Sequence, residues 1–187
     1  MRSSRWATRL KKRYMPSTKR DNCAKRNTVL FCGVALVWFL IDYASKRWAD
    51  TVQPGVQLWT GIPGILDFRL VHNTGAAWGM FGGSTFGLGV FAIVFCVLLI
   101  VVAALRRSKA QPAEMCGYAM VLAGGIGNAL DRFTSGYVVD FIETTFIDFP
   151  VFNVADIGVT CGFALIVIFY ILLNKDEAPA DPAKEEL

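Results

Sequence analysis

Three long, nearly uncharged apolar runs constrain this chain more than any other feature of its sequence. They extend over residues 28–48, 86–105 and 151–173. Each run is long enough to cross about 30 Å of hydrocarbon as an α-helix. A soluble domain of 187 residues does not need so much continuous apolar sequence, in a chain that is 54% hydrophobic. The sequence therefore predicts an all-α membrane protein.

A fourth span is predicted over residues 113–133 from its small side chains. This segment is rich in Gly and Ala and ends in several polar residues, so its hydropathy is low, but small residues suit close packing of helices in a membrane. We therefore expect four transmembrane helices in one domain, residues 28–174. A disordered basic arm, residues 1–27, and a frayed acidic tail, residues 175–187, would flank it.

The basic residues indicate how the chain is oriented in the membrane. Ten Lys or Arg precede residue 28, whereas segment 49–85 holds only Arg69 and segment 134–150 holds none. The short link between the second and third spans holds three more: Arg106, Arg107 and Lys109. Cytoplasmic segments carry the excess of Lys and Arg, so both termini should be cytoplasmic. The basic arm could bind nucleic acid, but ahead of a span it favours a role in topology and contact with anionic lipid, and we expect no nucleic-acid partner.

The segment between the first two spans has the character of an interfacial structure. It combines aromatic residues, among them Trp59, Phe68 and Trp78, with many glycines. Residues 66–70 alternate apolar and polar side chains, which is typical of a half-exposed strand. We expect a small β-like segment here, on the extracytoplasmic side between the first and second helices.

Carboxylates inside the predicted spans are costly and usually mark function. At about 1.5 Å per residue, Asp42 lies about 21 Å and Asp131 about 27 Å above the cytoplasmic ends of their helices. Asp156 lies about 8 Å below the outer end of the last helix. All three carboxylates are therefore predicted in the outer leaflet.

Helical spacing groups these acids with other polar residues. Asn128 shares a helix face with Asp131 and Arg132, and Asn153 shares one with Asp156, because residues three or four apart are neighbours on a helix. Two polar patches should therefore point inward from the third and fourth spans. We assign Asp131 and Arg132 to shaping the site between them.

The first span contributes a charged pair. Asp42 and Lys46 are four residues apart and can form an ion pair that neutralises itself, so we assign them a structural role.

Asp140 is the remaining candidate acid. It stands in an apolar window, residues 138–142, without an adjacent cation, and partial desolvation there would raise its pKa. If this segment folds back over the bundle, Asp140 and Asp156 can share one proton, as in an acid–base dyad. Asp131 is a poorer candidate for that proton, since the neighbouring Arg132 favours its ionised form. The alternative is that Asp140 is an exposed loop acid and Asp156 only caps its helix; spacing alone leaves both readings open.

Metal and cofactor chemistry finds little support in the sequence. His72 is the only histidine, so a Ser-His-Asp triad would depend on this one residue. The cysteines lack the paired spacing of a zinc site or a disulfide framework: Cys23, Cys32, Cys96, Cys116 and Cys161. We expect neither a metal nor a cofactor.

Several motifs in order along the chain carry a resemblance to a known family. They are Asp42-Tyr43-Ala44-Ser45-Lys46, Asn73-Thr74-Gly75-Ala76-Ala77-Trp78, Gly124-Gly125-Ile126-Gly127-Asn128-Ala129-Leu130-Asp131-Arg132, Val138-Val139-Asp140-Phe141 and Phe152-Asn153-Val154-Ala155-Asp156. Together they make the sequence, from about residue 40 to 170, similar to lipoprotein signal peptidase, or signal peptidase II. The long basic arm departs from the shorter family pattern.

The resemblance implies an aspartic endopeptidase of the bacterial cytoplasmic membrane, with its active site at the outer face. It implies Asp140 and Asp156 as the catalytic pair, and Asn73, Asn128 and Arg132 as residues that line the substrate site. We assign Asn153 to substrate binding as well. The implied substrate is a prolipoprotein that carries diacylglycerol on a cysteine and is cut just before that cysteine; membrane lipids are the other expected partner.

Two other classes of function remain open on the residues alone. Carboxylates on facing helices can bind a cation in a transporter or channel, although such sites tend to lie near the midplane and between repeated halves, and no repeat is visible here. The second alternative is an inert membrane scaffold. The free-energy cost of burying so many polar groups argues against it.

Overall fold

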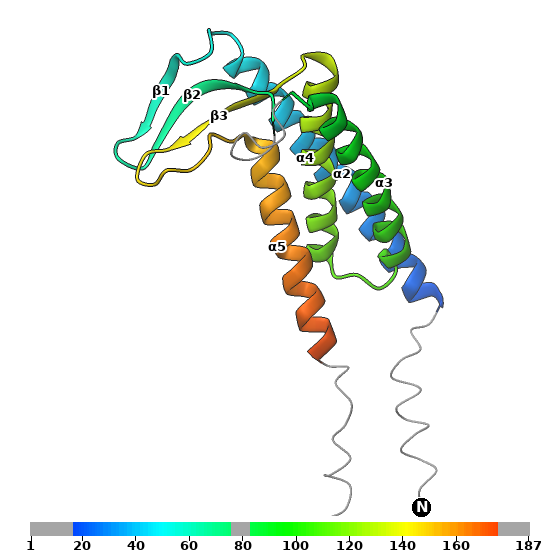
Figure 1. Cartoon of the computed structure of the whole chain (residues 1–187). Helices are drawn as coiled ribbons and strands as arrows, with labels where there is room; N and C mark the ends of the chain where they lie inside the picture. The colour runs from blue at the N-terminus through cyan, green and yellow to red at the C-terminus, as the bar shows by residue number, and fades with distance from the viewer. Residues whose placement is uncertain (1–16, 76–82, 176–187) are drawn as a thin grey trace, which may run out of the picture.

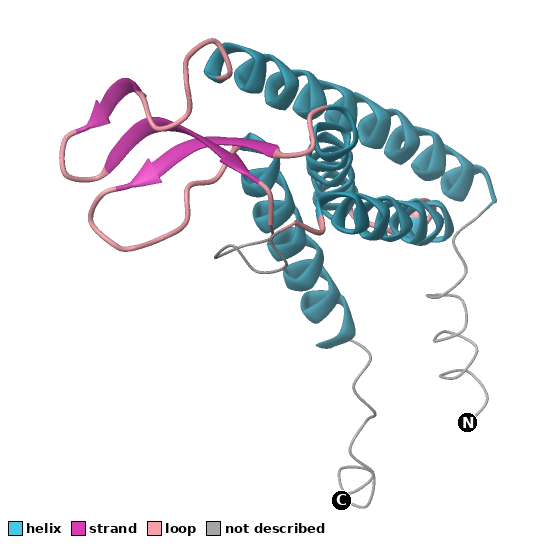
Figure 2. Ribbon diagram, turned by 45° about the horizontal axis from the view of Figure 1, so that its top comes forward, coloured by secondary structure: helices cyan, strands magenta, loops and turns pink. Residues whose placement is uncertain are grey.

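The computed structural model describes residues 17–75 and 83–175, which form four long helices and one small sheet. The elements follow in the order α2 (Ser17–Ala49), β1 (Gln57–Ile62), β2 (Leu66–Asn73), α3 (Thr85–Arg106), α4 (Pro112–Thr134), β3 (Val138–Thr144) and α5 (Val154–Lys175). The helices lie side by side, and the sheet projects from one end of the bundle (Figure 1). The start of α2 and the end of α5 lie at the opposite end (Figures 1 and 2).

Helix α4 is the central element of the bundle, in contact with α2, α3 and α5. Its small residues permit this, because they let backbones approach closely. A Cβ added to Gly117 would lie 2.7 Å from the carbonyl oxygen of Gly162 in α5, and one added to Gly162 would lie 2.6 Å from the carbonyl oxygen of Gly117. The predicted close packing of this segment is confirmed.

The four helices differ in how much apolar surface they expose. Helices α2 and α3 are long and apolar enough to cross a membrane, and α5 has a shorter apolar stretch, Val154–Phe169. Helix α3 exposes large apolar side chains along its length, such as Phe86, Phe91 and Leu105, each 70% exposed or more. Helix α4 is largely buried by the other three helices, so it can be less hydrophobic than a helix that exposes most of its surface. Length and hydropathy thus support two of the four predicted spans.

Helix α2 begins at Ser17, well before the predicted start of the first span at Thr28. Residues 17–27 are therefore helical, which corrects the expectation that the whole basic arm is disordered. Asn27 explains part of this order. Its side chain is fully buried and its amide donates to the carbonyl oxygens of Arg107 at 2.9 Å and Ala110 at 2.8 Å, which ties the early turns of α2 to the link between α3 and α4.

The three strands form an antiparallel sheet in the order β1-β2-β3. The predicted strand at residues 66–70 is confirmed as part of β2, and the segment between the first two helices holds β1 and β2, but strand β3 was not predicted. Strand β3 comes from the segment between α4 and α5 and pairs with β2, Asn73 opposite Val138 and Val71 opposite Asp140. The first five residues of β3 are buried on both faces, and apart from Asp140 they are apolar, so β3 lacks the alternation that marked β2.

An aromatic cluster fixes the sheet to the bundle. Trp48, near the end of α2, meets Phe68 of β2 and Phe141 of β3 edge-on, at ring-centroid distances of 6.4 and 6.1 Å. Such edge-to-face contacts add to the apolar area that the rings bury. Because β3 is both paired with β2 and packed on α2, the residues of β3 are held over the ends of the helices.

Candidate active site

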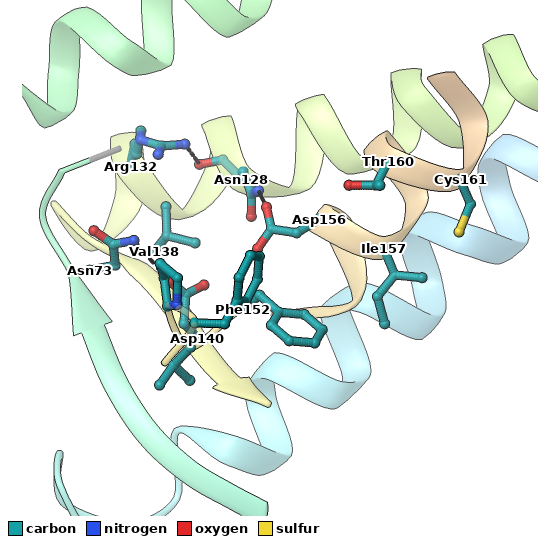
Figure 3. Close-up of a pocket in the computed structure, with 13 residues that line it drawn as sticks. Asn73, Asn128, Arg132, Val138, Asp140, Phe152, Asp156, Ile157, Thr160 and Cys161 are labelled. Carbon is teal, nitrogen blue, oxygen red and sulfur yellow. Dashed lines mark hydrogen bonds between the residues drawn. The ribbon is translucent and has the colours of Figure 1, made fainter. Parts of the chain in front are cut away.

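A pocket of about 470 Å³ lies where β2, β3, α4 and α5 meet (Figure 3). Its polar wall consists of Asn73, Asn128, Arg132, Asp140 and Asp156. Its other wall is mostly apolar: Val138, Phe149, Pro150, Val151, Phe152, Ile157, Thr160 and Cys161. The pocket therefore joins a charged centre to a surface suited to an apolar chain.

Strand β3 brings Asp140 into this pocket. Pairing with β2 places Asn73 near it, and the Asn73 Nδ2 donates to Asp140 Oδ2 at 2.9 Å. The Asn153 Nδ2 donates to the other oxygen, Oδ1, at 2.7 Å. Asp140 is only 3% exposed, so it is a buried strand residue and not the exposed loop acid of the alternative reading.

Asp156 enters the pocket from the first turn of α5. The Asn128 Nδ2 of α4 donates to Asp156 Oδ1 at 2.8 Å, and the backbone N–H of Asn153 donates to Oδ2 at 3.1 Å. The backbone N–H of Asp156 in turn donates to Asn153 Oδ1 at 3.0 Å. This reciprocal pair satisfies N–H groups at the start of the helix, so Asp156 does cap α5 while it also faces the pocket.

Asn153 links the two acids. Its side chain is fully buried behind them, with its Nδ2 on Asp140 and its Oδ1 on the backbone of Asp156. Each carboxylate oxygen of both acids thus accepts one N–H from an Asn: Asn73, Asn128 or Asn153. These donors fix the orientation of both carboxylates.

The surroundings of Asp140 change its acidity. Burial, and then the nearby carboxylate of Asp156, raise the pKa of Asp140 from 3.8 to about 7. The hydrogen bonds from Asn73 and Asn153, and then the charge of Lys46, oppose this rise. Asp140 is therefore able to hold or release a proton near neutral pH.

Arg132 lies at the edge of the pocket nearest to Asn73 (Figure 3). Its Nη1 donates to the carbonyl oxygen of Asn128 at 3.3 Å and its Nη2 to that of Gly75 at 3.1 Å. The buried Nε finds no hydrogen-bond acceptor among residues 17–75 and 83–175.

Lys46 and two acids form a buried charged cluster beside the pocket. The Lys46 Nζ lies 3.0 Å from Asp42 Oδ2 and 3.1 Å from Asp131 Oδ2, and Lys46 and Asp42 are each 1% exposed. The predicted pairing of Asp42 with Lys46 is confirmed. Asp42 Oδ1 also accepts the backbone N–H of Ala155 at 2.8 Å, which ties α2 to the start of α5.

Asp131 has a different place from that of Arg132. It lies against Lys46 and accepts the backbone N–H of Val139 at 3.3 Å, whereas Arg132 contacts Asn128 and Gly75. Adjacent residues on a helix point in different directions, so Asp131 faces α2 and Arg132 faces the pocket. Asp131 therefore has a structural place, in which it ties α2 and β3 to α4, while Arg132 lines the pocket.

The structure brings together most of the residues singled out in the sequence. Asn73, Asn128, Arg132, Asp140 and Asp156 line one pocket, and the remaining candidate, Asn153, lies behind it. The apolar wall of the pocket was not predicted from the sequence. One signal could have placed Thr160 there, because it stands one helical turn after Asp156 and shares its helix face. Ala76, Ala77 and Trp78, which end the motif that begins at Asn73, lie outside the described residues.

This geometry suits hydrolysis more than ion binding. Two carboxylates with separately fixed oxygens can divide the roles of acid and base, and a partly apolar pocket limits access of water. Within the described part of the chain, no three His, Cys, Asp or Glu side chains lie close enough to form a metal-binding group. Fold and site together describe a mostly helical protein with long apolar helices and two carboxylates that line one pocket.

Comparison with known proteins assigns the family. The family model for signal peptidase (SPase) II matches residues 34–172. A lipoprotein signal peptidase of Synechocystis is 35% identical over 139 residues, 74% of this chain and 85% of that relative. Another, from Lactococcus lactis subsp. lactis, is 34% identical and covers 76% of this chain and 93% of its own length. The chain belongs to the signal peptidase II family of membrane proteases.

Solved structures agree with this assignment. A bacterial membrane enzyme determined by the in meso method at 2.3 Å superimposes with a TM-score of 0.71 and 29% identity, covering 81% of this chain and 93% of that one. A second, determined at 1.9 Å, gives a TM-score of 0.65 at 31% identity, covering 74% of this chain and 90% of its own.

Proposed function

We propose that this chain is an aspartic endopeptidase that removes signal peptides from diacylglyceryl-modified prolipoproteins and cuts just before the lipidated cysteine. The observation that carries the proposal is the pair of carboxylates, Asp140 and Asp156, that line one pocket and are both hydrogen-bonded to Asn153. The substrate class follows from family membership and from the names of the relatives.

The mechanism divides the work between the two carboxylates. One, ionised, takes a proton from water, while the other, protonated, polarises the scissile carbonyl group. Water adds to the carbonyl carbon, and the tetrahedral intermediate collapses as a proton passes to the leaving amine. Asn73, Asn128 and Asn153 keep the carboxylates in position, and Arg132 adds a positive charge at the edge of the pocket.

The shared proton makes the reaction sensitive to pH. Because the pKa of Asp140 is raised to about 7, the pair should lose its proton, and with it the general acid, as pH rises through about 7. We expect kcat/KM to fall on this alkaline limb. Replacing Asn73 by Leu removes a hydrogen bond that lowers the pKa of Asp140, so the limb should move to higher pH. A limb that stays in place in Asn73→Leu would count against the role of Asp140.

We propose further that all four helices cross the cytoplasmic membrane, with both termini inside and the sheet at the outer face. Two observations support this. Helix α3 exposes the apolar surface of a lipid-facing helix, and α4 buries small residues as a central helix does. The pocket would then open at the level of the outer leaflet, where the lipidated end of a substrate lies.

Cysteine labelling tests this topology. In a variant with all five native cysteines replaced by Ala, a cysteine at Ser84 or Ser135 should react with a membrane-impermeant thiol reagent added outside intact cells. A cysteine at Ser108, between α3 and α4, should react only after the cells are opened. Labelling of Ser108→Cys in intact cells would reverse the orientation and place the site on the other side.

The lipid on the substrate should act mainly by setting the depth of the scissile bond in the membrane. Burying acyl chains is worth about 0.8 kcal/mol per methylene, but a substrate already in the bilayer has gained most of that energy. We therefore expect the chains to hold the scissile bond beside Asp140 and Asp156, against the apolar wall of the pocket. An unmodified precursor, anchored by its own apolar segment, should be cut at least about tenfold more slowly at equal membrane density. Equal rates would favour a general intramembrane peptidase.

A further inference from the structure

The buried ammonium group of Lys46 makes a contact that an ion pair with Asp42 does not require. Its Nζ donates to Asn128 Oδ1 at 2.8 Å, and the same Asn128 donates from Nδ2 to Asp156 Oδ1 at 2.8 Å. Lys46 is on α2, Asn128 on α4 and Asp156 on α5. A single asparagine side chain thus connects the charged cluster to one of the paired carboxylates.

The chemistry of the amide makes this connection directional. The two ends of an Asn side chain have almost the same shape, but one only accepts hydrogen bonds and the other only donates them. An ammonium group has three donors and no acceptor. Lys46 therefore requires Oδ1 of Asn128 on its side, which leaves Nδ2 on the side of Asp156.

The opposite orientation of Asn128 would be unfavourable at both ends. Its Nδ2 would face the ammonium of Lys46 and also the Nδ2 of Asn153, which now donates to Oδ1 at 3.1 Å. Its Oδ1 would face Asp156 Oδ1, an acceptor. Buried donors and acceptors left without partners are costly, so the orientation is fixed while Lys46 is in place.

The remaining donors of Lys46 hold the ammonium itself in position. The Nζ lies 3.0 Å from Asp42 Oδ2 and 3.1 Å from Asp131 Oδ2, so two ion pairs accompany the hydrogen bond to Asn128. A lysine side chain with this many fixed contacts and 1% exposure has little freedom to move. The two acids thus hold the residue that orients Asn128.

We propose that Lys46 is a positioning residue for the reaction: it fixes the orientation of Asn128 and, through Asn128, presents the carboxylate of Asp156 to the substrate. This inference rests on the proposed function. It differs from a purely structural role for Lys46, because a structural role requires only the ion pairs with Asp42 and Asp131.

The test compares three purified proteins that all carry Asp131→Asn: one with Lys46 retained, one with Lys46→Met and one with Lys46→Gln. Relative to the unsubstituted enzyme, the Met and Gln proteins lose one charge of each sign, so their buried net charge is unchanged, and the two proteins carry the same charge as each other. Met fills a similar volume without a donor, whereas Gln offers an N–H to Asn128 Oδ1 without a charge. Arg106→Met with Glu114→Gln removes another ion pair, a partly buried one at the α3–α4 link, and is the control for stability.

We expect Lys46→Met to lower kcat at least about tenfold, with KM changed by less than about twofold, and Lys46→Gln to stay within about threefold of the Lys46-retaining protein. The control pair should leave kcat unchanged. If Lys46→Met folds and keeps kcat within about twofold, or if Met and Gln lose kcat equally, the inference is overturned. Should the Met protein not fold, the Gln protein decides: a loss of about tenfold overturns the inference. Absence of cleavage by the unsubstituted enzyme would reject the proposed function instead.

Discussion

Asp140→Asn and Asp156→Asn should each reduce cleavage of a diacylated prolipoprotein by about a thousandfold, within the range that a positioned acid or base contributes. Asparagine keeps the size and much of the hydrogen bonding of aspartate, but it can neither take a proton from water nor share one. Both residues act in one proton-transfer system, so the double variant should be little worse than either single variant. Initial rates on a purified substrate, corrected for folded protein, measure this.

Asp148→Asn is the matched control for these variants. Asp148 lies between the two acids in the sequence and is exposed in the segment that joins β3 to α5. This variant should cleave at the rate of the unsubstituted enzyme. Full activity in either Asp140→Asn or Asp156→Asn, in protein that unfolds at the normal temperature, would contradict the paired-carboxylate mechanism.

A large loss of both stability and activity is expected from Gly124→Leu. A Cβ at this position would collide with the carbonyl oxygen of Ala155 and lie 2.9 Å from Cγ2 of Val159, both in α5. Backbone cannot move aside as a flexible side chain can, so α5 must shift from α4. We expect destabilisation of about 3 kcal/mol, the top of the usual range for overpacking. Because Asp156 follows Ala155 directly, cleavage by the remaining folded protein should fall as well.

Gly33→Leu separates this packing effect from the general effect of a larger side chain in a helix. Gly33 lies in α2, and a Cβ there would meet no atom within 4 Å among the described residues. Thermal unfolding in detergent should therefore be nearly normal for Gly33→Leu and shifted to lower temperature for Gly124→Leu. Equal shifts in the two variants would mean that the contact between α4 and α5 does not position the site.

The helices were predictable because their signals are local. Long apolar runs marked α2, α3 and α5, and the Gly- and Ala-rich composition of residues 113–133 marked α4. The start of α2 was missed because order there depends on Asn27, whose partners Arg107 and Ala110 lie far along the chain. Strand β3 was missed because a strand buried on both faces shows no alternation and resembles any short apolar run.

Some features of the site could be predicted from the sequence, and others could not. Asp140 and Asp156 were singled out by their unusual settings, and helical spacing placed Asn128 with Arg132 on one face. The same spacing placed Asn128 with Asp131, and both side chains contact Lys46, but the spacing could not show that this shared partner lies on another helix. Contacts between helices depend on how the bundle is assembled, and no periodicity within one segment contains that information. The link from Lys46 through Asn128 to Asp156 is visible only in three dimensions.

The central claim is that this chain cuts before a lipidated cysteine by means of Asp140 and Asp156. The most direct measurement incubates the purified protein with a synthetic peptide that carries diacylglycerol on its lipobox cysteine and determines both product masses. The account predicts one cut, with the lipidated cysteine as the new N-terminus, and no product from Asp140→Asn under the same conditions. A cut at another bond, or equal product from Asp140→Asn, would contradict it.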